Sequence, residues 1–205
     1  MVKNNIIFID ANVYLRFYDS SSNKFRSLLQ TLVELKENIF ITEQIYSEVQ
    51  RNKLSVALKS FSANYKSLGI MKTSLPEHLD NNVDKRLKQW NDSRNNILIE
   101  ERKLKKEYSE IVSSTLQSIM VSEDHVSKVL FNIFTSAKSA SPDEIVAARL
   151  RKELGNPPGK SNDPLGDQLT WEQFLTKYSN QEIWLITADR DYLTRMFHEI
   201  PNYNF

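Results

Sequence analysis

Short apolar runs mark three strands along the chain, at Asn4 to Asp10, Asn38 to Thr42 and Glu182 to Thr187. Continuous apolar runs of this length, too short for a helix, are typical of parallel strands that are buried on both faces. Between the first two runs, apolar residues recur at helical spacing from Val13 to Asp19 and from Lys24 to Lys36. This strand, helix, strand order predicts a βαβ unit, because parallel neighbours need a crossover connection.

The middle of the chain changes to a charged, helical pattern. Thr42 is a suitable N-cap for a helix from Glu43 to about Lys53. Residues 55–139 contain segments such as DKRLKQW and EERKLKKEYSE, which predict two or three helices. We expect this stretch to form a helical insertion or cap on a smaller α/β core.

The last third of the chain carries clear helix signals. Ser141 is a predicted N-cap with Pro142 at the first helical position, and Gly155 is expected to end that helix. The loop NPPGKSNDPLGD then leads into a helix from Asp167 to roughly Tyr178. A short apolar tail, which contains Ile200, Tyr203 and Phe205, predicts a further strand at the edge of the sheet.

Length and composition limit the classes of protein. The chain has 205 residues, 40% of them hydrophobic, which predicts a single folded domain over residues 1–205. It has no cysteine, so disulfides and thiolate metal sites are excluded, and no segment resembles a signal peptide or a membrane span, so we expect a cytoplasmic protein without a membrane partner. With four glycines, the chain contains no phosphate-binding glycine motif. The net charge of +1 gives no overall attraction to nucleic acid, so any such affinity must come from a local basic surface.

Acidic residues follow or adjoin the predicted strands and helices. Asp10 ends the first strand, Glu48 lies on the helix after the second, Asp167 begins a later helix and Asp189 follows the last strand. Ligands of α/β proteins bind at the carboxyl ends of parallel strands, so these acids can converge on one pocket. Clustered carboxylates repel one another unless a cation such as Mg²⁺ or Mn²⁺ joins them, and both ions prefer oxygen ligands.

The chain resembles the PIN-domain, or PIN-like, nucleases in four motifs in the family's order: FIDANVYLRFY, ITEQIYSEVQRN, PPGKSNDPLGDQLTWEQFL and WLITADRDYL. The resemblance implies a central parallel sheet of about four to five strands flanked by helices. It implies hydrolysis of RNA by Mg²⁺ or Mn²⁺ held by Asp10, Glu48, Asp167 and Asp189, and cleavage within the RNA strand. Asn12 and Thr187 would position the acids or a metal-bound water.

Each candidate residue also has a plainer interpretation. Asp10 and Asp167 could simply cap the helices that follow them, and Glu48 could be a solvated helix residue. Asp191 competes with Asp189 as the acid after the last strand, and we include it among the candidate metal ligands. Asn12 and Thr187 could make ordinary turn or cap hydrogen bonds.

Basic residues near these acids are candidates for binding phosphate, since guanidinium and ammonium groups suit that anion. They are Arg16, Arg51, Lys53, Lys160, Arg190 and Arg195. Most such residues are ordinary surface charges. The expected partner is single-stranded or structured RNA, and the resemblance also allows an antitoxin or another protein partner and a homodimer. Two alternatives stay open: a toxin of a toxin–antitoxin or defence system with the same chemistry, and a catalytically silent module that binds nucleic acid or protein.

Overall fold

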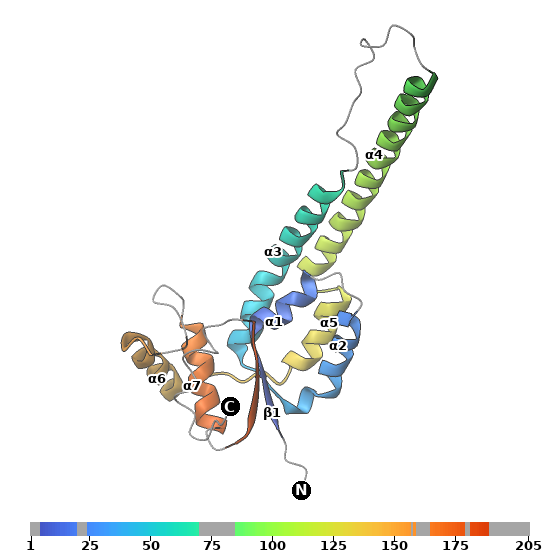
Figure 1. Cartoon of the computed structure of the whole chain (residues 1–205). Coiled ribbons are helices and arrows are strands. Elements are labelled where there is room, and N and C mark those ends of the chain that lie inside the picture. The colour runs from blue at the N-terminus through green and yellow to red at the C-terminus, as the bar shows by residue number, and fades with distance from the viewer. Residues whose placement is uncertain are drawn as a thin grey trace.

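The computed structural model describes residues 5–19, 24–69, 85–156, 158, 165–178 and 181–188, and its centre is a parallel sheet. Strand β1 (Ile6–Ile9) lies between β2 (Ile39–Phe40) and β3 (Ile183–Ile186), as Figure 1 shows in part. The predicted parallel α/β architecture is therefore confirmed. The described residues form three strands, so the predicted fourth and fifth strands are not confirmed, and the apolar C-terminal tail lies outside the described ranges.

Helices cover the sheet from both sides (Figure 1). On one side lie α1 (Ala11–Leu15), with the 3-10 turn η1 (Arg16–Tyr18), then α2 (Lys24–Glu34) and the turn η2 (Lys36–Asn38). Helix α5 (His125–Phe134) packs beside α2. Helices α6 (Pro142–Glu153) and α7 (Gly166–Tyr178) lie on the other side.

Aromatic side chains join both helical layers to the strands. Phe8 and Phe40 are paired in the sheet, and the ring of Phe174 on α7 lies 5.6 Å from the first and 6.0 Å from the second. Across the molecule, Phe134 on α5 contacts Tyr14 at 5.1 Å between ring centroids. All of these rings are buried. Helix α5, which lies within the stretch 55–139, therefore contributes directly to the core.

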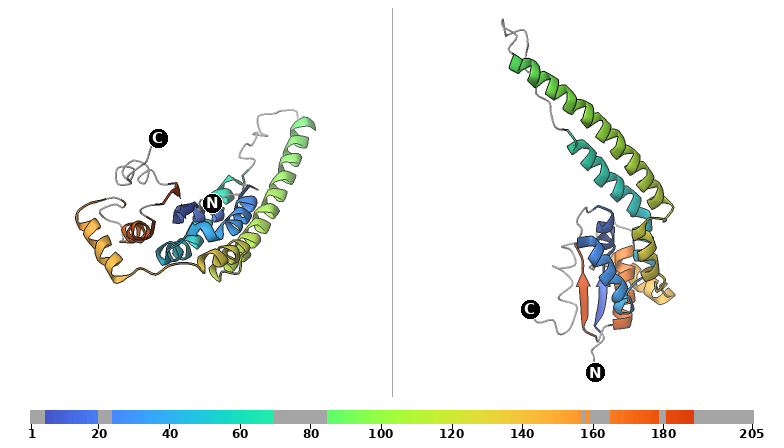
Figure 2. Two further views of the ribbon diagram at one scale, coloured as in Figure 1. Left: turned by 90° about the horizontal axis from the view of Figure 1, so that it is seen from below. Right: turned by 90° about the vertical axis from the view of Figure 1, so that its right-hand side faces the viewer.

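Helix α3 (Glu43–Ser67) is longer than predicted, because it does not end near Lys53. No glycine or proline interrupts it, and the buried Ala57 extends its packed face beyond that point. Helix α4 (Lys85–Met120) runs back alongside it, with the hydroxyl of Tyr108 donating to the carbonyl of Phe61 at 3.0 Å. We call residues 54–67 of α3 together with α4 the arm. It projects away from the sheet in Figure 2.

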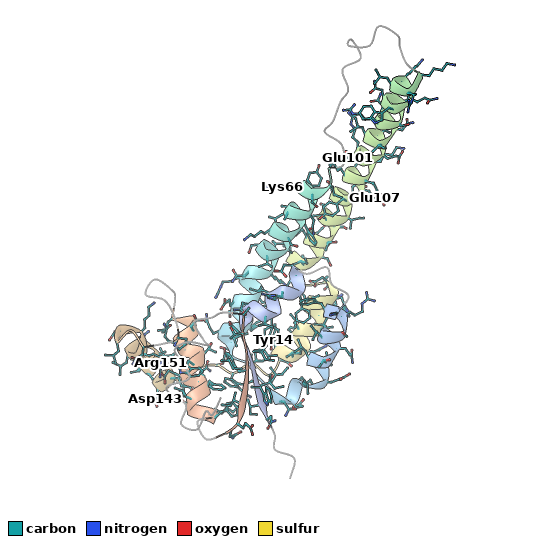
Figure 3. All side chains as sticks on the ribbon, viewed as in Figure 1. Tyr14, Lys66, Glu101, Glu107, Asp143 and Arg151 are labelled. Atoms are coloured by element: carbon teal, nitrogen blue, oxygen red, sulfur yellow. The ribbon has the colours of Figure 1, made fainter. Side chains whose placement is uncertain are left out.

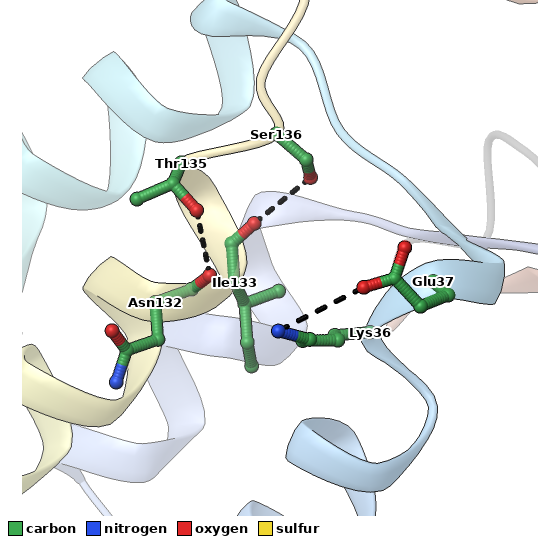
Figure 4. Close-up of polar contacts among 6 residues, drawn as sticks. All are labelled: Lys36, Glu37, Asn132, Ile133, Thr135 and Ser136. Carbon is green, nitrogen blue, oxygen red and sulfur yellow. Dashed lines mark hydrogen bonds and ion pairs between the residues drawn. The ribbon is translucent and has the colours of Figure 1, made fainter.

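The ends of α6 confirm the local signals in the sequence. Ser141 caps α6 in a capping box with Glu144, and Gly155 follows the helix with a φ of 69°. At the end of α5, the hydroxyl of Thr135 donates to the carbonyl of Asn132 at 2.8 Å, as drawn in Figure 4. The chain then turns so that Lys138 pairs with Thr42, which extends the line of β2.

An ion pair between Arg151 and Glu172 joins α6 to α7, and both side chains are largely buried. Because exposed pairs contribute little and this one is shielded from solvent, it fixes the two helices relative to each other more firmly than a surface pair would. No helix in the described ranges has the length and apolar character to span a bilayer.

Candidate functional site

The carboxyl ends of β1 and β3 are joined immediately beyond the last sheet residues. The backbone N–H of Asp10 donates to the carbonyl of Ile186 at 3.0 Å, which continues the ladder by one bond. The hydroxyl of Thr187 then donates to Oδ2 of Asp10 at 2.8 Å. A hydrogen bond to a carboxylate is among the stronger ones in proteins, so it orients this side chain at the edge of the sheet.

Asp10 does not use its carboxylate to cap the helix that follows it. Its backbone has the extended conformation of an N-cap residue, but its side chain makes no cap hydrogen bond to α1. Its backbone carbonyl accepts from the N–H of Val13 at 3.0 Å. The plain capping interpretation of Asp10 therefore does not account for its carboxylate, which is half-buried and held by a threonine from another strand.

Asn12 connects the same two segments. Its Oδ1 accepts from the backbone N–H of Ala188 at 3.2 Å, so the amide side chain binds the chain directly after β3. This contact lies one residue before Asp189. Asn12 and Thr187 thus both form hydrogen bonds across the sheet edge.

The beginnings of α3 and α7 meet beside this edge. Thr42 caps α3 by accepting from the N–H of Ile45 at 3.3 Å, and its hydroxyl lies 3.2 Å from that of Thr170 on α7. The side chain of Gln44 lies directly against Gly166, so close that a β-carbon on residue 166 would be 2.9 Å from its Cδ. The absence of a side chain at Gly166 is what allows this approach.

This packing relates Glu48 to Asp167. Glu48 lies one turn beyond Gln44 on the same face of α3, while Asp167 follows Gly166 in the first turn of α7. Both carboxylates are half-buried. Asp167 also lies at the positive end of its helix dipole, which favours an anion there. The helices that carry the two acids are thus in direct contact, through Gln44 and Gly166.

The carboxylates of the candidate acids are the hard oxygen donors that Mg²⁺ or Mn²⁺ requires. Among the described residues, however, no three histidine, aspartate or glutamate side chains are grouped closely enough to hold a metal ion. The fourth predicted acid, Asp189, and its competitor Asp191 lie outside the described ranges. The four-carboxylate site stays a prediction.

Only some of the predicted phosphate-binding residues lie in the described ranges. Arg16 is exposed at the end of α1, and Arg51 is exposed on α3 less than one turn beyond Glu48. The prediction for Lys53 is wrong, because its side chain is buried and bonded to serine hydroxyls. Lys160, Arg190 and Arg195 lie outside the described ranges. A shallow pocket of about 240 Å³ lies elsewhere, between β2, α6 and α7, and its lining includes Phe40 and Gln173 but none of the candidate acids.

A buried polar cluster lies where the arm meets the body, and the sequence did not predict it. Lys53 is 3% exposed, and its ammonium group donates to Ser122 at 2.6 Å and to Ser127 at 3.0 Å. The hydroxyl of Ser127 lies 2.9 Å from that of Tyr18. Burial lowers the pKa of Lys53, against the opposing charge of Asp124. The cluster fixes α3, η1 and the turn before α5 together, five residues beyond Glu48.

Sequence signals for this cluster were weak. Lys53 occupies an inward position of α3, four residues after the buried Val49 and four before the buried Ala57. A lysine at such a position is the one available sign of a buried cation, because charged side chains are seldom buried without partners. The structure shows a second unusual feature of this cluster, which the sequence does not reveal. Ser122 has a φ of 61°, which is rare for a residue other than glycine.

Comparison with known proteins gives one match. A family model described as a PIN-like domain matches residues 6–192, a range that includes every candidate acid. No curated protein and no solved structure matches the chain.

Proposed function

Because the chain belongs to the PIN-like domain family, whose fold is of the nuclease type, we propose that it is a metal-dependent nuclease that hydrolyses RNA phosphodiester bonds within the strand. Asp10, Glu48, Asp167 and Asp189 are the proposed ligands of Mg²⁺ or Mn²⁺, with Asp191 as the alternative to Asp189. The observation that supports this most directly is the Asp10 carboxylate, which Thr187 orients and which caps no helix.

Each described residue has a definite task in this proposal. Thr187 would fix the rotation of the Asp10 carboxylate through the hydrogen bond to Oδ2. Asn12 holds the backbone at Ala188 and thereby sets where the chain leads into Asp189. The contact between Gln44 and Gly166 keeps Asp167 beside the helix that carries Glu48. These contacts would restrict the orientations of the acids before a metal binds, and so lower the cost of gathering like charges around it.

A bound divalent cation would lower the pKa of an attacking water and neutralise charge on the phosphate. The chain therefore needs no nucleophilic side chain of its own, in agreement with the absence of cysteine. Repulsion among the acids makes the protein without metal less stable, so metal binding should stabilise the native state.

The test combines cleavage with thermal stability. In wild-type protein, Mn²⁺ at about one hundred times its dissociation constant should add about 2.7 kcal/mol, or about 5 to 10 °C in melting temperature for a chain of this size. It should also allow cleavage of a labelled single-stranded RNA. Asp10→Asn should remove both effects while the protein without metal stays folded.

The matched control is Asp143→Asn, which makes the same chemical change at an exposed acid on α6, labelled in Figure 3. It should keep cleavage and most of the Mn²⁺ stabilisation. Full cleavage by folded Asp10→Asn would remove Asp10 from the mechanism. A wild-type protein that neither cleaves RNA nor responds to Mn²⁺ would refute the proposal and favour the module that only binds.

A further inference from the structure

A polar stripe runs along α3 from the candidate active site into the arm. Its members follow one another at spacings of four and three residues, which places them on one face of the helix. They are Glu48, Asn52, Ser55, Lys59, Ser62 and Lys66. We call this set the polar stripe. From Ser55 outward every member is exposed, and Lys66 lies near the outer end of α3 in Figure 3.

The polar stripe is not the packing face of the helix. The buried residues Val49, Lys53 and Ala57 lie on the opposite side of α3. A third side of α3 contacts α4. There the Phe61 carbonyl accepts a hydrogen bond from Tyr108, and the ring of Tyr65 lies 6.1 Å from the ring of Tyr108. Packing within the chain therefore does not explain why this face is free of apolar residues.

The charge on this part of α3 is entirely positive. Beyond Glu48 the helix contains no aspartate or glutamate, and it carries Arg51, Lys59 and Lys66 at exposed positions. In the part of the chain that the structure describes, neither of the two stripe lysines forms an ion pair. A chain with a net charge of only +1 thus places uncompensated cations on the helix of a candidate catalytic acid.

Lysines without an ion pair are not general in the arm, as two lysines of α4 show. Lys103 and Lys105 pair with the adjacent acids Glu100 and Glu101 at 2.7 Å and 2.5 Å. Their charges are neutralised locally, whereas those on the polar stripe remain available to a ligand. A partner that meets this stripe is therefore selected by negative charge.

We propose that the polar stripe binds the sugar–phosphate backbone of the nucleic acid whose cleavage site lies at Glu48, an inference that rests on the proposed nuclease function. Ammonium groups neutralise phosphates, and the hydroxyl and amide groups between them donate to backbone oxygens. Protein interfaces have an apolar or aromatic centre, which the polar stripe lacks.

The dimensions of the helix set the length of the bound segment. At a rise of 1.5 Å per residue, Lys59 and Lys66 lie about 16 Å and about 27 Å along the axis from Glu48. Phosphates of one strand of double-stranded DNA are spaced by about 3.4 Å along its axis, and on that scale the outer lysine is roughly eight nucleotides from the cleavage site. The substrate is thus an extended or duplex RNA, longer than a dinucleotide.

The experiment measures binding apart from cleavage. A fluorescein-labelled 20-nucleotide RNA is titrated with the full chain in EDTA, and anisotropy gives the affinity at several salt concentrations. The variant is Lys59→Gln with Lys66→Gln. Its matched control is Arg26→Gln with Arg149→Gln, which removes two exposed cations from α2 and α6.

Loss of two phosphate contacts should reduce the slope of log K against log salt by about 1.4 and weaken binding at least tenfold at about 0.1 M salt. The control should change both quantities much less. An unchanged slope and affinity in the lysine variant, or an equal loss in the control, would overturn the inference. Stripe-dependent binding without any Mn²⁺-dependent cleavage would instead refute the proposed catalysis and leave the binding surface established.

Discussion

The hydrogen bond from Thr187 to Asp10 can be removed with almost no change in shape, because valine replaces the hydroxyl of threonine with a methyl group. A hydrogen bond to a charged group contributes about 1.5 to 3 kcal/mol net. Both side chains are half-buried, and the contact is 2.8 Å long, so we take the lower end of that range. Thr187→Val should therefore lower the free energy of unfolding by about 1.5 kcal/mol, or the melting temperature by about 3 to 6 °C.

A double-mutant cycle separates this hydrogen bond from other effects of the substitution. The four proteins are wild type, Thr187→Val, Asp10→Ala and the double variant, since alanine removes the acceptor whereas asparagine would keep one. Urea unfolding in EDTA should give a coupling energy of about 1 kcal/mol between the two positions. Additive losses would show that the hydrogen bond does not hold the carboxylate.

The same variant tests the positioning role of Thr187 in catalysis. A loss of about 1.4 kcal/mol in the transition state corresponds to a tenfold lower kcat/KM. We expect that decrease for Mn²⁺-dependent RNA cleavage by Thr187→Val, and recovery in Thr187→Ser, which keeps the hydroxyl. Unchanged kcat/KM in the valine variant would refute the reasoning, whatever its stability.

Four further predictions concern residues at and near the site. Gly166→Ala should lower the free energy of unfolding by at most about 1 kcal/mol, because its new β-carbon would meet the end of the Gln44 side chain, which can rotate away; urea unfolding in a Gln44→Ala background should show the loss removed. Tyr14→Phe should raise the free energy of unfolding by about 1 kcal/mol, since the tyrosine hydroxyl is buried and has no hydrogen-bond partner in the described structure, and a less stable variant would contradict this. Burial raises the pKa of Tyr18 to about 12 from 10.0, so the native state holds its proton longer and loses stability between these pH values; melting temperatures across this window should decline less in Tyr18→Phe. Burial lowers the pKa of Lys53, which makes stability rise with pH up to the ordinary lysine value, and Lys53→Met should abolish that rise.

Local features of the fold were predictable because they depend on neighbouring residues. The apolar runs identified β1, β2 and β3, and the capping box at Ser141 fixed the start of α6. The end of α3 was not predictable from the change in composition near residue 55. A solvated, charged sequence can continue a helix without interruption when no glycine or proline ends it.

The sequence by itself determined the types of the secondary structure elements. It also determined that Asp10 and Asp167 lie at element ends and that Glu48 lies on the helix after β2, since these positions follow from local periodicity and helix-start signals. Only the tertiary structure decided which groups touch: Thr187 with Asp10, Asn12 with the backbone at Ala188, and the buried Lys53 with two serines. These partners are far apart along the chain. Their contact depends on strand register and helix packing, which are set by the burial of the whole core rather than by the residues beside each group.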